Sequence, residues 1–167
     1  KNKESQLTKL ATEDPLTGIL NRRALVKNAV DSHRVYTPSC ICMMDLDHFK
    51  QVNDECGHSI GDKVLVAFCE IVASEIRHSD LLGRLGGEEF ALVLPQTNLD
   101  DGIQLAERIR KRVEAELAAS VYGNFDIAIT VSIGVVEWHA EDFNKALSRA
   151  DKCLYEAKAL GRNQTCS

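Results

Sequence analysis

Hydrophobic residues recur along the chain in two patterns, one with the spacing of helices and one with the closer spacing of strands. Positions three and four apart predict helices over residues 1–13, 22–33, 49–55, 58–77, 100–118 and 142–160. Continuous apolar runs and alternation predict strands over residues 39–46, 81–85, 90–94 and 125–138. The second and third strands flank Gly86 and Gly87, so we expect these two strands to form a hairpin.

The order of these elements predicts an α/β protein with one mixed sheet and helices packed against it. At 167 residues the chain fits one domain, which we assign to residues 14–167. Residues 1–13 form a short amphipathic segment that ends at Asp14-Pro15. Two interpretations of this segment stay open: a linker helix from an upstream regulatory domain, and a frayed terminal helix resting on the domain. The first residue, Lys1, favours a piece of a longer protein.

Composition and charge exclude several classes of protein. Hydrophobic residues make up 44% and charged residues 27% of the sequence, and no apolar run reaches the ~20 residues that a membrane span needs. We therefore expect a cytoplasmic domain without direct membrane contact, although its parent protein can be membrane-anchored. A net charge of −5 argues against binding to a nucleic acid polymer but allows a small phosphorylated ligand. The six cysteines include no CxxC pair, and we expect reduced thiols in the core.

Four acidic residues fall at predicted strand ends, namely Asp45, Asp47, Glu88 and Glu89. If the first strand lies beside the hairpin, Asp45 and Glu88 come close together. Two carboxylates ~4 Å apart repel by ~4 kcal/mol at an effective dielectric constant of about 20, which a bound cation or a shared proton relieves. Oxygen ligands without His or Cys favour Mg²⁺ bridged to substrate phosphates. Solvated strand ends are the alternative, and spacing alone weighs the two equally.

Two further pairs of polar residues offer groups for a nucleotide. Lys158 and Arg162 lie four apart at the end of the last predicted helix, where they can face phosphate oxygens or stabilise the helix C-terminus, the more common role. Asn53 and Asp62 flank the break at Gly57 between two predicted helices. An amide with a carboxylate matches the hydrogen-bonding groups of guanine.

Several motifs in a fixed order resemble the GGDEF family of diguanylate cyclases. They are DPLTGILNRR (14–23), DLDHFKQVND (45–54), GHSIGD (57–62), RLGGEEF (84–90), SIGV (132–135), ADKCLYEAK (150–158) and GRN (161–163). The match spans nearly the whole chain and is therefore specific, which a lone GGEEF would not be. Glu88 stands where the family name has Asp, and both forms occur in active members. The resemblance implies a five-stranded central mixed sheet surrounded by helices, a palm-like nucleotide cyclase fold.

The resemblance also implies roles for individual residues. Mg²⁺, or Mn²⁺ in its place, would bind Asp45, the Leu46 carbonyl and Glu88, and Asp45 and Glu88 would be the catalytic residues. The guanine base of GTP would lie on Asn53 and Asp62. The remaining GTP contacts would be His48, Phe49, Lys50, Gly86, Gly87, Lys158 and Arg162. Structural or supporting roles would fall to His58, Glu89 and Phe90.

Members of this family face each other in pairs, each holding one GTP. The resemblance therefore implies a homodimer that releases cyclic di-GMP and two pyrophosphates. Arg77 and Asp80 match the family's RxxD site, through which cyclic di-GMP inhibits the enzyme, because Asp80 precedes Gly86 by the expected five-residue gap (81–85). An ordinary polar helix end is the structural alternative. The alternative function is a catalytically inactive receptor for GTP or cyclic di-GMP, a class marked by degenerate signature turns.

Overall fold

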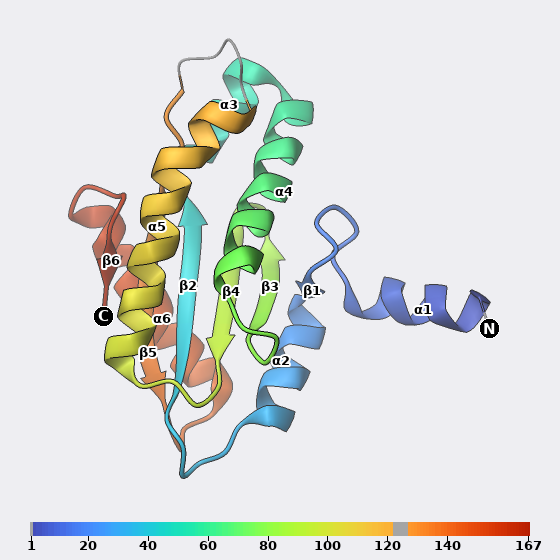
Figure 1. Cartoon of the computed structure of the whole chain (residues 1–167), viewed down its shortest axis with the longest axis vertical. Helices are drawn as coiled ribbons and strands as arrows, with labels where there is room; N and C mark the ends of the chain where they lie inside the picture. The colour runs from blue at the N-terminus through green and yellow to red at the C-terminus, as the bar shows by residue number, and fades with distance from the viewer. Residues whose placement is uncertain (1, 122–126) are drawn as a thin grey trace.

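The computed structural model describes residues 2–121 and 127–167, which form one mixed sheet between two layers of helices (Figure 1). In chain order the elements are α1 (Asn2–Thr12), β1 (Leu20–Asn21), α2 (Arg22–Ser32), β2 (Ser39–Leu46), α3 (Phe49–Cys56), α4 (His58–Glu75), β3 (Leu81–Gly86), β4 (Glu89–Leu94), α5 (Leu99–Val121), β5 (Val131–Trp138), α6 (Phe143–Ala159) and β6 (Thr165–Cys166). The strand order across the sheet is β1-β3-β4-β2-β5-β6, and β2 runs antiparallel to both β4 and β5. The predicted fold class is confirmed.

The sheet has six strands in the described ranges, rather than the five that the family resemblance implied. The edge strands β1 and β6 have two residues each, too short to show alternation in the sequence. The expected strand over residues 125–138 is also wrong in its first part, because β5 begins at Val131 and residues 127–130 are not strand, while residues 125–126 lie outside the described residues. Val131 pairs with Leu46, the last residue of β2. Residues 127–130 therefore have no residue of β2 to pair with.

Each face of the sheet has its own apolar core, and β2 is therefore buried on both sides along its whole length. Met44 belongs to the cluster that contains Phe68 of α4 and Ile109 of α5. Met43 belongs to the cluster on the other face, which contains Ala150 of α6 and residues of α2. A continuous apolar run is typical of such a doubly covered strand, which explains why the sequence predicted β2 well.

Helix α6 packs closely on β5 because Gly134 has no side chain. A Cβ atom at Gly134 would lie 2.2 Å from the carbonyl oxygen of Ala150 and 2.3 Å from the backbone nitrogen of Leu154. Backbone atoms cannot rotate away from such a clash, so a side chain here would push the helix off the sheet. The close contact therefore fixes the position of α6, including its last turn, relative to the sheet.

Helix α1 extends away from the sheet (Figure 1), and its residues Leu7 and Leu10 are 63% and 75% exposed. The short helix expected over residues 1–13 is present. Its role as a linker from an upstream domain stays a prediction. No helix within residues 2–121 and 127–167 combines the length and the apolar character that crossing a bilayer requires.

Candidate active site

The end of β2 and the turn between β3 and β4 bring several acidic residues together. Asp45 pairs with Glu89 across the two strands, and the Leu46 N–H donates to the Glu88 carbonyl at 3.4 Å. The structure therefore brings Asp45 close to the turn that carries Glu88, as the hairpin predicted. Gly87 in the turn has a φ of 52°, which favours glycine, and an added Cβ there would meet no atom within 4 Å. The space beside the turn is thus open.

Asp45 carries a charge that its surroundings disfavour. The residue is 6% exposed. Burial raises the pKa of the Asp45 carboxyl to about 6, against the opposing effect of Lys158, and Glu88 and Glu89 raise it further. The Lys158 Nζ, from the last turn of α6, lies 2.7 Å from the Asp45 Oδ2. The acidic cluster therefore contains one ammonium group, which holds the strand end to the helix end.

Asp47 has quite different surroundings, although it lies only two residues further along the chain. Its carboxylate accepts hydrogen bonds from the hydroxyls of Thr130 and Ser132, each at 2.7 Å, and from the Asn163 N–H at 3.0 Å. The residue is 3% exposed. Asp47 thus connects the end of β2 to β5 and to the segment after α6, and its role is structural.

Asn53 and Asp62 lie near each other across the turn between α3 and α4. A Cβ added at Gly61 would lie 2.0 Å from the Oδ1 of Asn53, so the glycine lets the two helices approach closely. Asp62 follows directly and is exposed, whereas Asn53 is half-buried. Neither side chain has a hydrogen-bond partner among the residues described. The pair is free to accept a ligand, as its predicted role requires.

The amino end of α3 offers unpaired backbone N–H groups directly after the acidic strand end. His48 precedes the helix with a φ of 54°, and no side chain caps the helix. The N–H groups of Phe49 and Lys50 have no acceptor within the described part of the chain. Unpaired N–H groups at the start of a helix attract anions. The geometry is compatible with the predicted phosphate contact of this segment.

The expected helical pairing of Lys158 and Arg162 is not found. Helix α6 ends at Ala159, and Gly161, Arg162 and Asn163 have φ values of 121°, 65° and 46°. Arg162 therefore lies in a left-handed turn beyond the helix, held by the hydrogen bond from Asn163 to Asp47. The Arg162 side chain is exposed, and none of the described residues bonds its guanidinium. Its contact with phosphate stays a prediction.

Arg77 and Asp80 form a tight pair just after α4. The Arg77 backbone N–H donates to the Asp80 Oδ2 at 2.7 Å, and its guanidinium donates to the Oδ1 at 3.1 Å. The guanidinium also donates to the Thr97 hydroxyl at 2.7 Å and to the Pro95 carbonyl at 3.0 Å. The pair lines a cavity of about 280 Å³, with Arg108 on its wall.

Two residues that support the hairpin turn were not predicted as functional. The Arg84 guanidinium lies 3.2 Å from the Asp14 carboxylate and donates to the Gly87 carbonyl at 2.9 Å. Both residues stand in recognisable motifs, but spacing along the chain does not reveal a pair so far apart. Phe90 is fully buried, which suits the structural role expected of it, and His58 is exposed as the first residue of α4.

A mixed sheet whose central strand ends in acidic residues beside a hairpin turn is typical of palm-like nucleotide cyclase domains. The family model for the GGDEF domain of diguanylate cyclases matches residues 11–164, so this chain belongs to that family. The chain is 40% identical over 159 residues to the probable diguanylate cyclase DgcT of Escherichia coli, covering 93% of this chain and 35% of that protein. It is 42% identical over 163 residues to the response regulator PleD of Caulobacter vibrioides, with coverage of 92% and 35%.

Solved structures agree with this assignment. The coiled coil and GGDEF domain of DgcB from Caulobacter crescentus, in complex with c-di-GMP, superposes with a TM-score of 0.89 at 30% identity, covering 99% of this chain and 90% of that one. The active GGEEF domain of a diguanylate cyclase from Vibrio cholerae gives a TM-score of 0.78 at 34% identity, with coverage of 87% and 95%. The match covers 35% of each of these two curated relatives, so the chain spans about a third of their length.

Proposed function

We propose that this domain joins two molecules of GTP into cyclic di-GMP, with release of two pyrophosphates, and that two copies act together. The observation that carries the proposal is Asp45, a buried carboxylate with a pKa raised to about 6, next to two more acids at an open turn. Membership of the family and relatives named as diguanylate cyclases support the same activity.

Asp45, the Leu46 carbonyl and Glu88 would hold Mg²⁺, or Mn²⁺ in its place. These donors are all oxygens, and none of the described residues bonds the Glu88 carboxylate, so the set suits a hard divalent cation. Within the described residues, no group of three or more His, Cys, Asp and Glu side chains is arranged so that it could hold a metal ion, so substrate phosphates would complete the coordination. When bound, the ion would stabilise charge on the α-phosphate and help the attacking hydroxyl to ionise.

The protein groups would bind and orient the nucleotide. Asn53 and Asp62 would accept the donors of guanine, and the N–H groups at the start of α3 would hold phosphate oxygens. Lys158 now bonds to Asp45 at 2.7 Å. With the nucleotide bound, the Lys158 ammonium would contact a phosphate oxygen, and the exposed Arg162 would bind beside it.

The product contains two guanosines related by symmetry, whereas one copy offers one such acidic turn. The second GTP therefore comes from a second copy, arranged about a two-fold axis. In each step the ribose 3′ oxygen of one GTP attacks the α-phosphorus of the other. The bond between this phosphorus and the pyrophosphate oxygen breaks, pyrophosphate leaves, and the hydroxyl proton passes to solvent.

The test is to incubate the protein at high concentration with GTP and Mg²⁺ and to separate the nucleotides. We expect cyclic di-GMP from the wild type and from Glu70→Gln, an exposed acid on α4 that serves as a matched control. Glu88→Gln should form none. Nucleotide binding without any cyclic di-GMP, even from an enforced dimer, would contradict the proposal and favour the receptor alternative.

Product inhibition through Arg77 and Asp80 is the second part of the proposal. A guanidinium and a carboxylate can bind the two edges of a guanine, and the adjoining cavity of about 280 Å³ leaves room for it. Arg77→Ala should therefore relieve inhibition by added cyclic di-GMP and leave the initial rate unchanged. An inhibition curve identical to that of the wild type would remove Arg77 from this role.

A further inference from the structure

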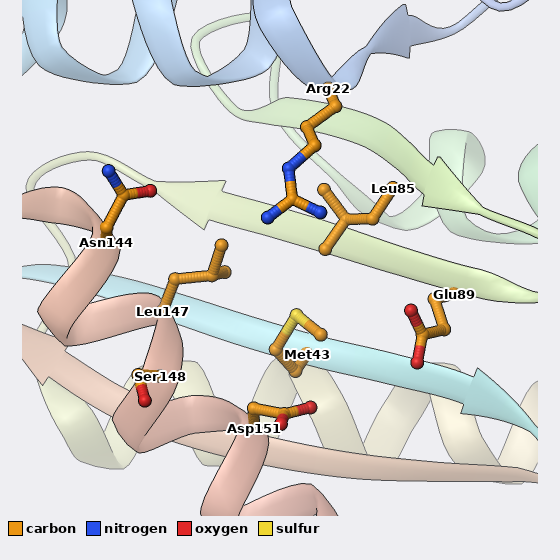
Figure 2. A pocket seen from close by; sticks show the side chains of 8 residues that line it. All are labelled: Arg22, Met43, Leu85, Glu89, Asn144, Leu147, Ser148 and Asp151. Carbon is orange, nitrogen blue, oxygen red and sulfur yellow. The ribbon is translucent and has the colours of Figure 1, made fainter.

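A gap between α2 and α6 opens where β4 begins. Helix α2 packs on β3, and α6 packs on β5 and β2; in the strand between them, β4, the first residue, Glu89, is exposed and the residues after it are buried. A cavity of about 470 Å³ lies in this gap (Figure 2). Its lining residues are Arg22 from α2, Met43 from β2, Leu85 from β3, Glu89 from β4, and Asn144, Leu147, Ser148 and Asp151 from α6.

The charged groups of this cavity are exposed and have no partners among the described residues. The Arg22 guanidinium and the carboxylates of Glu89 and Asp151 make no hydrogen bond or ion pair within residues 2–121 and 127–167. Every other arginine except Arg162 donates at least one hydrogen bond from its side chain. The Arg22 side chain points from α2 into the cavity, toward Leu85 (Figure 2). These donors and acceptors surround a floor formed by Met43, Leu85 and Leu147, and they are available to a ligand that enters the cavity.

The cavity adjoins the proposed catalytic centre but lies on the opposite face from the base site. Glu89 lines the cavity and also pairs with Asp45 across β2 and β4. Asn53 and Asp62 belong to α3 and α4, which pack in the cluster on the other face of the sheet. A GTP whose base lies between α3 and α4 would therefore leave the cavity of its own copy free.

We propose that this cavity contacts the GTP that is held by the second copy of the chain, and this inference rests on the proposed function. The planar fork of Arg22 suits phosphate oxygens. Asp151, with Asn144 and Ser148 beside it on α6, offers acceptors for ribose hydroxyls or guanine N–H groups. A cation and acceptors on different walls match a nucleotide better than a metal ion, which Arg22 would repel.

Arg22 would then act at the bond-forming step on the other copy's GTP. Attack on the α-phosphorus redistributes negative charge over the phosphoryl oxygens, which a guanidinium supplied by a neighbouring subunit can stabilise. The two-fold arrangement gives each GTP the metal site of its own copy and Arg22 of the other. The catalytic centre would thus be shared between copies in its residues as well as in its substrates.

The first experiment measures cyclic di-GMP formation by Arg22 variants at saturating GTP. Arg22→Ala should lower the rate by at least ~10²-fold, and Arg22→Lys should restore part of it, since Lys keeps the charge without the fork. Arg34→Ala is the matched control, because Arg34 is exposed and its side chain bonds only to backbone carbonyls. Wild-type rates in a folded Arg22→Ala protein would overturn the inference while leaving the proposed function intact. An inactive wild type would instead defeat the proposed function.

The second experiment mixes Arg22→Ala and Asp45→Asn proteins in equal amounts. In a mixed pair, the GTP on the Arg22→Ala copy has an intact Asp45 in its own copy and an intact Arg22 in the other. One phosphodiester bond can form there, so the linear dinucleotide pppGpG should accumulate at least ~10-fold above the sum of the separate variants. The other position lacks both groups, so the ring does not close.

Two outcomes of these measurements would contradict a contact between copies. A mixture no more active than its separate components would mean that Arg22 acts on the GTP of its own copy. GTP binding should also be measured at protein concentrations where the chain is monomeric. If Arg22→Ala weakens binding there, Arg22 contacts a nucleotide without a second copy, and the proposed contact between copies is wrong.

Discussion

Asp45 is the second-last residue of β2 and Asp47 directly follows the strand; both are almost fully buried, yet their surroundings are opposite. Asp47 accepts three hydrogen bonds, which satisfy its carboxylate as the chain folds. Burial raises the pKa of Asp45 to about 6, because Lys158 is the only side chain among the described residues that donates to it, and Glu88 and Glu89 raise the pKa further. Burial is therefore common to both acids, and the shortage of donors is what distinguishes the acid of the proposed site.

The largest expected effect concerns turnover in Asp45→Asn. The amide keeps the shape of the side chain but removes the charge that would bind Mg²⁺, so the rate of cyclic di-GMP formation should fall by at least ~10³-fold. Asp47→Asn is the matched comparison, because this carboxylate contacts only protein donors. We expect its rate at 25 °C to stay within ~10-fold of the wild type while the protein remains folded. An equal loss of activity in both variants would abolish the distinction between the two acids.

The second effect concerns stability in Asp47→Ala. This change leaves the half-buried hydroxyl of Thr130, the buried hydroxyl of Ser132 and the N–H of Asn163 without their acceptor. The free energy of unfolding in urea should therefore fall by ~3–5 kcal/mol. Asp54→Ala, an exposed acid on α3, should change it by less than ~0.5 kcal/mol. A decrease of less than ~1 kcal/mol in Asp47→Ala would show that these hydrogen bonds do not stabilise the end of β2.

The end of β2 also shows how far the sequence predicts the structure. The apolar run within residues 39–46 predicted the strand with its observed bounds, because burial on both faces leaves only apolar residues from Cys40 to Met44. The hairpin placed beside this strand predicted that Asp45 and Glu88 would meet. The hydrogen bonds of Asp47 could not be predicted in the same way, because they depend on the register between β2 and β5 and on the turn after α6.

Two other features could not be predicted from the sequence, one because of local backbone geometry and one because of helix packing. The helical spacing of Lys158 and Arg162 failed because three consecutive residues with positive φ follow α6, and two of them are not glycine. The cavity at Arg22 was missed because it arises from the distance between α2 and α6 across the sheet, which no sequence pattern encodes. Residue types thus indicated the chemistry of the site, whereas packing determined which polar groups stayed unpaired.

The smallest expected effect is a pH-dependent gain of stability in Asp45→Asn without Mg²⁺. The pKa of Asp45 is about 6 in the folded chain and lies near its ordinary value of ~3.9 in the unfolded chain. Between these values the folded state binds more protons than the unfolded state, so the wild-type unfolding free energy decreases as pH rises from about 4 to 6. Asparagine does not titrate and avoids this loss.

Asp45→Asn should therefore unfold like the wild type near pH 4 and be more stable at pH 8 by ~1–2 kcal/mol, a value that allows for solvent screening. Urea unfolding in the presence of EDTA at both pH values measures the difference. Added Mg²⁺ should then stabilise the wild type more than the variant, because only the carboxylate binds the ion in the folded state. Asp47→Asn should not be more stable than the wild type, since the Asp47 carboxylate already has three donors. A gain of equal size in both variants would mean that the raised pKa of Asp45 does not reflect a shortage of partners.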